Sequence, residues 1–327
     1  MLGVLAAVAG AVLVADYRTW ELSALHNEED PRYLDVPAGS SFKTIVWLLV
    51  DEGLVDRPRY FEFMARQRGD AGRIQSGEYN VPPGIRPAEL LDRLVRGQVI
   101  QYSFTIIEGW TFNQLRVALK ADPRVLDTLS DVDDEDVMAA LGQEGVHPEG
   151  RFYPDTYSFT RGTRDIDVLR RAFGAMEREL ENAWSERTDG LPIADPYEAL
   201  ILASIIEKET GLGSERRTIA GVFSRRLQQN MRLQTDPTVI YGMGNSYEGR
   251  IRTRDLRTDT PYNTYTRRGL PPTPIAMPGR ASLRAAVDPE PGDALYFVSR
   301  GDGSHHFSAT YEEHRKAVQR YILGRNE

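Results

Sequence analysis

Some segments of this chain have the pattern of hydrophobic and polar residues of a strand, and others have that of a helix. Together these patterns predict a mixed α+β fold. Residues 36–55 and 81–100 each open with a strand-like Val-Pro, pass through a turn with a glycine, and continue with apolar side chains three and four residues apart. That spacing is typical of an amphipathic helix, and Gly39 and Gly84 would tolerate a positive φ in the turns. A weaker copy runs from Ile106 to Leu119. The repeated strand, turn and helix predict small α+β modules.

The rest of the chain is predicted to be mainly helical. One helix is expected from Asp165 toward Trp184, and another after Asp195, which can act as N-cap with Pro196 in the first helical position. Residues 122–150 are acidic and predicted to be partly helical, and residues 235–278 are predicted to be rich in loops. The chain is predicted to close with a strand at residues 294–300 and a helix at residues 308–323.

The first 15 residues carry no charge and lie directly before Asp16. As a helix they would reach about 22 Å, less than the roughly 30 Å of a bilayer core. A short signal anchor, a signal-peptide apolar region and a buried helix all remain open. We expect an anchor at residues 1–16 and a linker at residues 17–35. Arg18 and Lys43 follow the apolar stretch and no basic residue precedes it, so the charges do not orient it.

Composition excludes several classes of function. The 327 residues are enough for one large domain or two ordinary ones, and their formal net charge of -8 argues against a general nucleic-acid binder. The chain has no Cys, which excludes disulfides and thiolate zinc sites. His305 and His306 are adjacent but lack helical spacing and a nearby acidic partner in the sequence. No metal site and no cofactor are therefore expected.

The segment Ile201–Gly211, ILASIIEKETG, is the first candidate for chemistry, because a helix suited to a core ends in two carboxylates. Glu207 and Glu209 are two residues apart, which separates them by about 200° on a helix, so they cannot share one site. Apolar neighbours and the negative end of the helix dipole would raise the pKa of Glu209, as a general acid requires. The alternative is that both glutamates form surface ion pairs with Lys208 or the arginines that follow.

A second candidate is MRLQTDPTVIYGMG, residues 231–244. Thr235, Asp236 and Pro237 predict a turn, with Gln234 and Tyr241 flanking an apolar strand. The alternative is that Asp236 caps the start of a helix.

A third candidate is residues 260–279, which combine five prolines with Tyr262, Asn263 and Tyr265. Aromatic rings can stack on the apolar face of a sugar, and amides can bind its hydroxyls, so this composition suits a saccharide. Six arginines near these motifs could attract an acidic strand or could simply be solvated surface: Arg225, Arg226, Arg232, Arg250, Arg252 and Arg254.

Five motifs, ASIIEKET, MRLQTDPTVIYGMG, YNTYTRRGLPP, EGRFYPDTY and LYFV, resemble the MltG (YceG-like) endolytic murein transglycosylases. The similarity runs from about Val36 to the C-terminus. It implies a single-pass protein of the bacterial inner membrane with an extracytoplasmic LysM-like module, expected at residues 36–102. A larger α+β catalytic domain is expected at residues 103–327.

The resemblance also implies an activity and a set of site residues. Such an enzyme cleaves the bond between MurNAc and GlcNAc in nascent peptidoglycan, leaves 1,6-anhydroMurNAc ends and terminates strand elongation. Glu209 takes the position of the catalytic acid, with Glu207 as the alternative, and His306 that of a family histidine. The glycan cleft is expected to contain Gln234, Thr235, Asp236, Tyr262, Asn263 and Tyr265. The implied partners are glycan strands and peptidoglycan synthases.

Two other functions remain open from the sequence. A glycoside hydrolase would need a second carboxylate, for which Asp236 and Asp155 are candidates. A non-catalytic envelope scaffold would bind glycan strands through the LysM-like module without cutting them.

Overall fold

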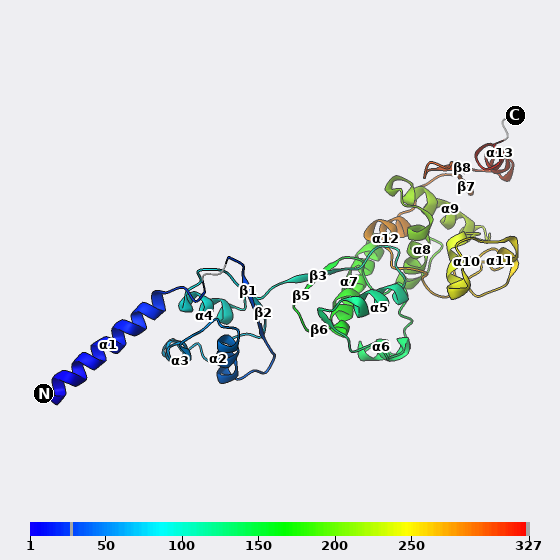
Figure 1. Ribbon diagram of the computed structural model, residues 1–327. Helices are drawn as coiled ribbons and strands as arrows, with labels where there is room; N and C mark the ends of the chain where they lie inside the picture. Colours follow the sequence, from blue (N-terminus) through cyan, green and yellow to red (C-terminus); the bar gives the residue numbers. More distant parts are fainter. Residues whose placement is uncertain (27–28, 325–327) are drawn as a thin grey trace. The chain divides into compact units, whose positions relative to one another are not determined.

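The computed structural model describes residues 1–26 and 29–324 as a mixed α+β chain (Figure 1). It divides into two compact units. The smaller comprises Met1–Ser103 with Ser158–Thr163, and the larger comprises Phe104–Tyr157 with the described part of Arg164–Glu327. The predicted fold class, α+β, is confirmed.

The smaller unit packs helices against a two-stranded sheet. Its elements are α1 (Leu2–Leu22), β1 (Arg32–Val36), α2 (Phe42–Asp51), α3 (Pro58–Gln67), β2 (Gly77–Val81) and α4 (Pro87–Arg96). Strands β1 and β2 are antiparallel, with Leu34 opposite Tyr79, and both of these side chains are fully buried. The turns after the two strands place Gly39 at φ 79° and Gly84 at φ 76°, which confirms the repeat of strand, glycine turn and helix.

The N-terminal segment differs in extent from the prediction. Helix α1 continues to Leu22 and β1 begins at Arg32, so parts of the expected linker, residues 17–35, are helix and strand. Among the described residues, no helix is both long enough and apolar enough to cross a membrane.

The third copy of the repeat, from Ile106 to Leu119, lies in the larger unit. Strand β3 (Tyr102–Thr105) pairs with β5 (Thr156–Phe159), and the division between the units falls within both strands. Gly109, at φ 78°, lies in the turn that leads to α5 (Phe112–Ala121).

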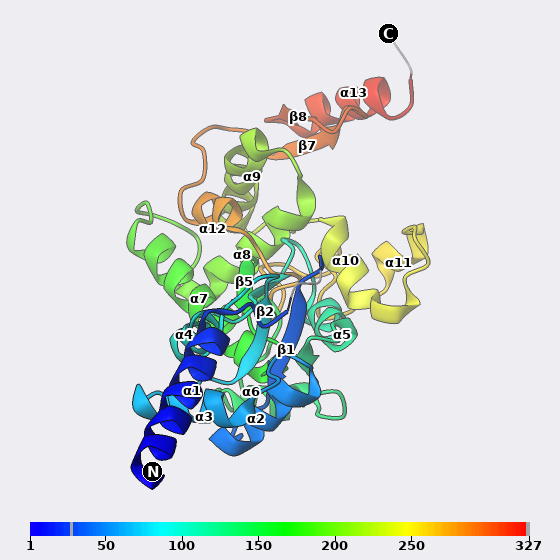
Figure 2. The same cartoon turned by 60° about the vertical axis from the view of Figure 1, so that its left-hand side comes forward.

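The larger unit is built around one buried helix, α8 (Pro196–Glu209), with α7 (Asp165–Ser185), α9 (Arg216–Gln228) and α12 (Arg280–Val287) packed against it (Figures 1 and 2). All residues from Ala199 to Ile206 are buried. The other elements are β4 (Val125–Leu126), α6 (Asp134–Ala140), β6 (Thr163–Arg164), α10 (Asp236–Met243), α11 (Thr253–Arg257), β7 (Tyr296–Ser299), β8 (His305–Ser308), α13 (Tyr311–Tyr321) and the 3₁₀ turns η1 (Gly213–Glu215) and η2 (Gly244–Ser246).

Two predicted elements need correction. The apolar strand expected after the Thr235 turn is wrong, because these residues form helix α10. Pro237 occupies one of its first positions, where the missing N–H costs nothing, and this outweighs the β-branched side chains that suggested a strand.

The closing strand and helix are confirmed as β7 and α13, but β7 pairs antiparallel with a second strand, β8, which the sequence pattern did not predict.

Candidate functional site

Helix α8 carries both candidate glutamates at its C-terminal end, as predicted. Its start is fixed by Asp195, whose side chain accepts the Glu198 N–H at 2.9 Å, with Pro196 in the first turn. The last helical residue is Glu209. Because the middle of the helix is buried, its end brings a carboxyl group to the edge of the core.

Glu209 is a half-buried residue whose carboxyl accepts a hydrogen bond from a neutral donor. Its Oε2 accepts the Thr235 hydroxyl at 2.6 Å. Burial is the largest effect and raises the pKa of Glu209 above its ordinary value, and the charge of Asp236 also raises it. The hydrogen bond from Thr235 and the charges of His305 and Arg226 lower this pKa, but by less than burial raises it. The net shift is upward, in the direction expected from the sequence. This carboxyl therefore keeps its proton to a higher pH than an exposed glutamate.

The Glu207 side chain contacts a different set of residues. Its Oε2 accepts the Gly279 N–H at 3.0 Å and the Ser282 hydroxyl at 2.7 Å, while Oε1 lies 3.3 Å from Nη2 of Arg216. Only 6% of the side chain is exposed. These contacts tie α8 to the start of α12, so Glu207 has the surroundings of a structural carboxylate. The two glutamates therefore face different directions, as expected for residues about 200° apart around a helix.

The second and third candidate segments meet beside Glu209. The Thr235 N–H donates to Oγ1 of Thr264 at 3.1 Å, and the Tyr265 hydroxyl donates to Oδ1 of Asp236 at 2.6 Å. Thr235 is the N-cap residue of α10 but makes no capping bond with its side chain, and its hydroxyl donates to Glu209. Thr235, Asp236 and Tyr265 thus gather around the candidate acid.

Gln234 holds an unusual backbone conformation at this junction. Its φ is 51°, a left-handed value that costs a residue with a Cβ about 1–2 kcal/mol. The Gln234 N–H donates to the Thr264 carbonyl at 3.2 Å, and its side chain is exposed. Such outliers concentrate where a site needs an exact backbone path.

The other two predicted cleft residues lie elsewhere in the larger unit. Asn263 is fully buried, and its amide donates to the carbonyls of Asp255, Leu256 and Thr258. Its Oδ1 accepts the Tyr265 N–H at 2.9 Å, so the side chain shapes the loop that presents Tyr265.

Tyr262 packs edge-on against Tyr241, with ring centroids 4.9 Å apart. Its hydroxyl lies 2.8 Å from Oγ1 of Thr273. Tyr262 therefore belongs to a neighbouring cavity and not to the group around Glu209.

A histidine and its carboxylate were missed by the sequence reasoning. The His305 N–H donates to Oε1 of Glu215 at 3.0 Å, and Nδ1 of the ring lies 2.7 Å from Oε2. His305 is close enough to lower the pKa of Glu209, whereas the ring of His306 packs on Tyr321 at 5.5 Å. The resemblance pointed to His306. Neighbouring side chains on a strand point to opposite faces, so a predicted strand could have distinguished His305 from His306, but no strand was predicted here.

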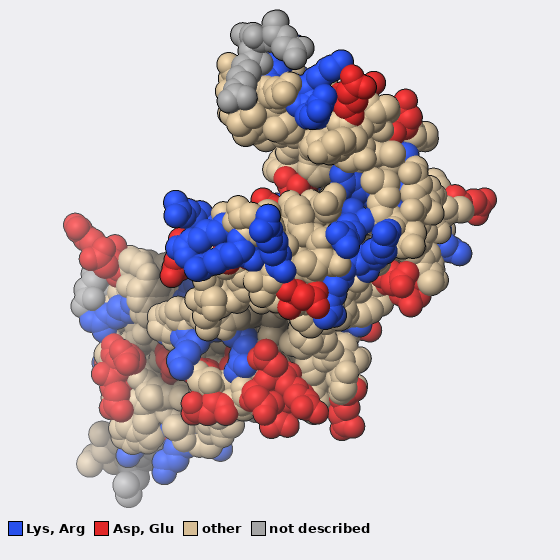
Figure 3. Space-filling view, turned by 90° about the vertical axis from the view of Figure 1, so that its right-hand side faces the viewer, with Lys and Arg blue, Asp and Glu red and all other residues tan. Residues whose placement is uncertain are grey.

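The six arginines do not form one uniform cationic surface. Arg225 and Arg226 donate to the carbonyls of Ala294 and Leu295, and Arg252 and Arg254 contact acidic neighbours. Figure 3 shows basic and acidic groups interspersed on the face that it presents. Arg232 and Arg250 are exposed and make no side-chain hydrogen bond or ion pair with the described residues.

Glu149 is a second buried carboxyl that the sequence did not single out, with 4% of the residue exposed. Its Oε1 accepts the Phe112 N–H and its Oε2 the Tyr241 hydroxyl, each at 3.0 Å. Burial is the largest effect and raises its pKa to about 7.

Replacing Glu149 by Gln is expected to change how stability depends on pH. A carboxyl with a raised pKa in the folded state stabilises the fold below its unfolded pKa, and this stabilisation is lost as pH rises to about 7. The lost contribution is on the order of 3 kcal/mol. The free energy of unfolding in urea, measured from pH 4 to 8, should therefore increase for Glu149→Gln relative to the wild type as pH rises. A difference that is constant across this range would contradict the assignment.

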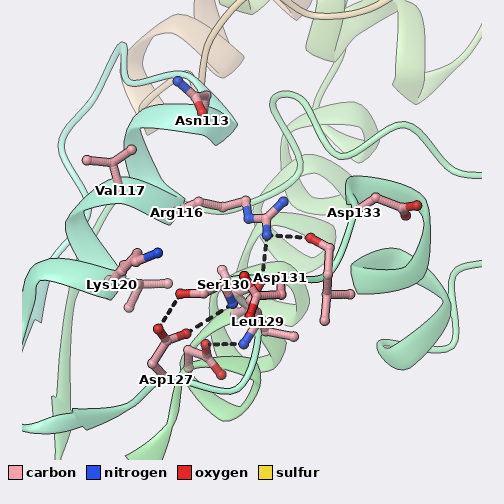
Figure 4. Close-up of a pocket in the computed structure, with 13 residues that line it drawn as sticks. Asn113, Arg116, Val117, Lys120, Asp127, Leu129, Ser130, Asp131 and Asp133 are labelled. Atoms are coloured by element: carbon pink, nitrogen blue, oxygen red, sulfur yellow. Dashed lines mark hydrogen bonds between the residues drawn. The ribbon is translucent and has the colours of Figure 1, made fainter.

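A cavity of about 470 Å³ beside α5 and α7 carries many polar groups, several of which are hydrogen-bonded within the protein (Figure 4). Arg116 donates to Asp134 and to the carbonyls of Leu129 and Val132. Asp127 accepts from Ser130. These bonds close the loop before α6, so we assign this cavity a structural role.

The fold and the site define an α+β protein with a carboxyl group of raised pKa, suited to acid–base chemistry, at the half-buried end of a core helix. The chain belongs to the YceG-like family, whose model matches residues 34–320. The family predicted from the sequence motifs is confirmed.

Relatives of this chain include proteins named as endolytic murein transglycosylases. One from Bacillus subtilis (strain 168) is 30% identical over 90% of this chain and 86% of its own length. One from Streptococcus pneumoniae serotype 2 is 26% identical over 88% of this chain, which spans 58% of that relative. The crystal structure of a YceG-like protein from Listeria monocytogenes is also similar, with a TM-score of 0.57 and 30% identity over 88% of this chain and 99% of that one.

Proposed function

We propose that this protein is an endolytic murein transglycosylase that cleaves the MurNAc–GlcNAc bond of nascent peptidoglycan and leaves 1,6-anhydroMurNAc ends, which terminates strand elongation. The observation that carries the proposal is the half-buried carboxyl of Glu209 at the end of α8, with the Thr235 hydroxyl as its hydrogen-bond donor and a raised pKa. The family membership and the names of the relatives support the same activity.

Glu209 acts twice in the proposed mechanism. Its proton passes to the bridging oxygen as the bond from that oxygen to C1 of MurNAc breaks and positive charge develops on the sugar. The C6 hydroxyl of the same sugar then attacks C1, and its proton passes to the Glu209 carboxylate. The acid is regenerated and no water is consumed. Because the nucleophile belongs to the substrate, a second catalytic carboxylate is not needed.

The groups around Glu209 have supporting roles in this proposal. Thr235 orients the carboxyl, and Asp236, held by Tyr265, favours its protonated form. His305, oriented by Glu215, and the buried Arg226 favour the ionised form that must exist after the first step. Gln234 is placed to present its exposed side chain to the strand, while Glu207 and Asn263 hold the framework.

The finer features of the family remain part of the proposal. The smaller unit, with its strand, two helices and strand, supports a LysM-like module at residues 36–102 that binds glycan strands. Exposed apolar side chains on α1, among them Val8, Val12 and Leu13, support an anchor at residues 1–16. We place the protein in the inner membrane with its catalytic domain outside the cytoplasm, next to peptidoglycan synthases.

Product analysis on uncrosslinked glycan strands tests the activity. A transglycosylase leaves anhydro ends, which are lighter by one water than the reducing ends that a hydrolase leaves. Reducing ends would favour the hydrolase, with Asp236 or the exposed Asp155 as second carboxylate. Strands that bind but are not shortened would favour the non-catalytic scaffold.

Replacing Thr235 by Val is expected to move the pH dependence of cleavage. The Thr235 hydroxyl stabilises the ionised carboxyl, so its loss raises the pKa of Glu209 further. Since the acid works only while it holds its proton, the alkaline limb of kcat/KM should shift to higher pH. Thr235→Ser keeps the hydroxyl and should match the wild type. An unchanged alkaline limb in Thr235→Val would remove Thr235 from this role.

A further inference from the structure

A cavity of about 750 Å³ in the larger unit lies next to the candidate acid but does not include it. Two of its lining residues, Lys208 and Pro237, directly adjoin Glu209 and Asp236 in sequence. The cavity extends along α10 to Tyr247 and faces the start of α5. Its volume falls within the range of sites that bind small ligands.

The wall of the cavity is a fixed aromatic platform. Tyr241 and Tyr262 pack edge to face at 63°, and both line the cavity. Glu149 holds the Tyr241 hydroxyl and Thr273 holds that of Tyr262. Because Glu149 is buried and also accepts the Phe112 N–H, the Tyr241 hydroxyl is tied to the core.

Two charged side chains at the cavity, Asp134 and Lys208, are hydrogen-bonded within the protein. Asp134 accepts from Arg116 at 2.6 Å, and Nζ of Lys208 donates to the Gly109 carbonyl at 3.1 Å. Burial raises the pKa of Glu149 to about 7, which favours the uncharged carboxyl. What the cavity offers to a ligand is therefore tyrosine rings and the exposed amides of Asn113, Gln114 and Asn245. This lining suits an uncharged, amphipathic ligand better than a peptide with several carboxylates.

We propose that this cavity is a saccharide subsite that binds an N-acetylated sugar of the glycan strand through the Tyr241, Tyr262 and Tyr247 rings and the amides at its edge. The inference rests on the proposed function, since it makes the strand the ligand. It assigns to the cavity the sugar and not the stem peptide. The subsite extends the substrate contact along α10, away from the bond that is cut.

Tyr247→Ala tests the subsite in the full chain, because Tyr247 lines the cavity and its hydroxyl has no hydrogen bond to the described residues. The probes are the GlcNAc tetramer and, separately, the free stem pentapeptide, with binding measured by calorimetry. Loss of one stacked ring should weaken tetramer binding roughly tenfold. Asn245→Ala, at an exposed position, gives a second variant that should also weaken it. Tyr311→Ala, at a 66% exposed tyrosine on α13, is the matched control and should bind like the wild type.

The outcomes separate this inference from the proposed function. If Tyr247→Ala and Asn245→Ala, both folded by circular dichroism, bind the tetramer like the wild type, the subsite is wrong even where anhydro ends are formed. If the loss appears with the pentapeptide and not with the tetramer, the cavity is a peptide site and the inference is overturned. If the tetramer depends on Tyr247 but the wild type produces no anhydro ends, the subsite stands and the proposed activity falls.

Discussion

Glu209→Gln should abolish strand cleavage while leaving the protein folded. Glutamine has the same size and its amide oxygen can still accept the Thr235 hydroxyl, but it has no proton to give to the bridging oxygen. Removing a general acid typically costs about 10²–10⁴-fold in rate, and here the same group must also act as the base. We therefore expect kcat to fall at least about 10³-fold. The measurement is the rate of appearance of anhydro ends by mass spectrometry.

The binding and stability of this variant separate catalysis from folding. Strand affinity should stay close to that of the wild type. Because the pKa of Glu209 is raised in the folded state, the ionised form is disfavoured there, and at neutral pH Glu209→Gln should be at least as stable as the wild type. Glu312→Gln, at a surface side chain that is 70% exposed, is the matched control and should cleave normally. Normal cleavage by Glu209→Gln would end the assignment.

Glu207→Gln should show the opposite behaviour, with a large loss of stability. The Glu207 carboxylate is almost fully buried against Arg216 and binds the start of α12 through Gly279 and Ser282. The amide can keep one acceptor oxygen, but its NH₂ group gives Arg216 a donor where it had an acceptor. Breaking a buried ion pair in this way costs about 3–5 kcal/mol.

The free energy of unfolding in urea measures this loss, and the cleavage rate should be expressed per folded molecule. We expect a lower free energy of unfolding and cleavage within a few-fold of the wild type at low temperature. A stable Glu207→Gln protein that no longer cleaves, beside a Glu209→Gln protein that does, would exchange the roles of the two glutamates.

Local signals made much of the core helix predictable. Asp195 and Pro196 mark the start of α8, as capping rules predict. The helix ends at Glu209, shortly before Gly211, but Thr210 at its C-cap is extended and Gly211 does not take a left-handed conformation. The separation of Glu207 from Glu209 follows from helix geometry alone. The direction of the Glu209 pKa shift could also be predicted, since burial and the helix end act in the same sense.

The partners of the acid could not be predicted from spacing, because they come from distant parts of the chain. Thr235 lies 26 residues after Glu209, and Glu215 lies 90 residues before His305. The resemblance named Thr235 without a role and His306 as a family histidine, whereas the histidine that contacts Glu215 is His305. Asn263 illustrates the limit most clearly: its composition suited a sugar site, but its amide is used by three backbone carbonyls of the same loop.

The titration of the Glu209 carboxyl itself tests the central claim most directly. Glutamate labelled with ¹³C at the side-chain carboxyl, in the wild type and in Glu209→Gln, identifies this resonance by its loss in the variant. The account predicts a midpoint clearly above the ordinary 4.5, moving further upward in Thr235→Val. A midpoint at or below 4.5 would mean that the side chain is ionised at neutral pH and cannot serve as the acid.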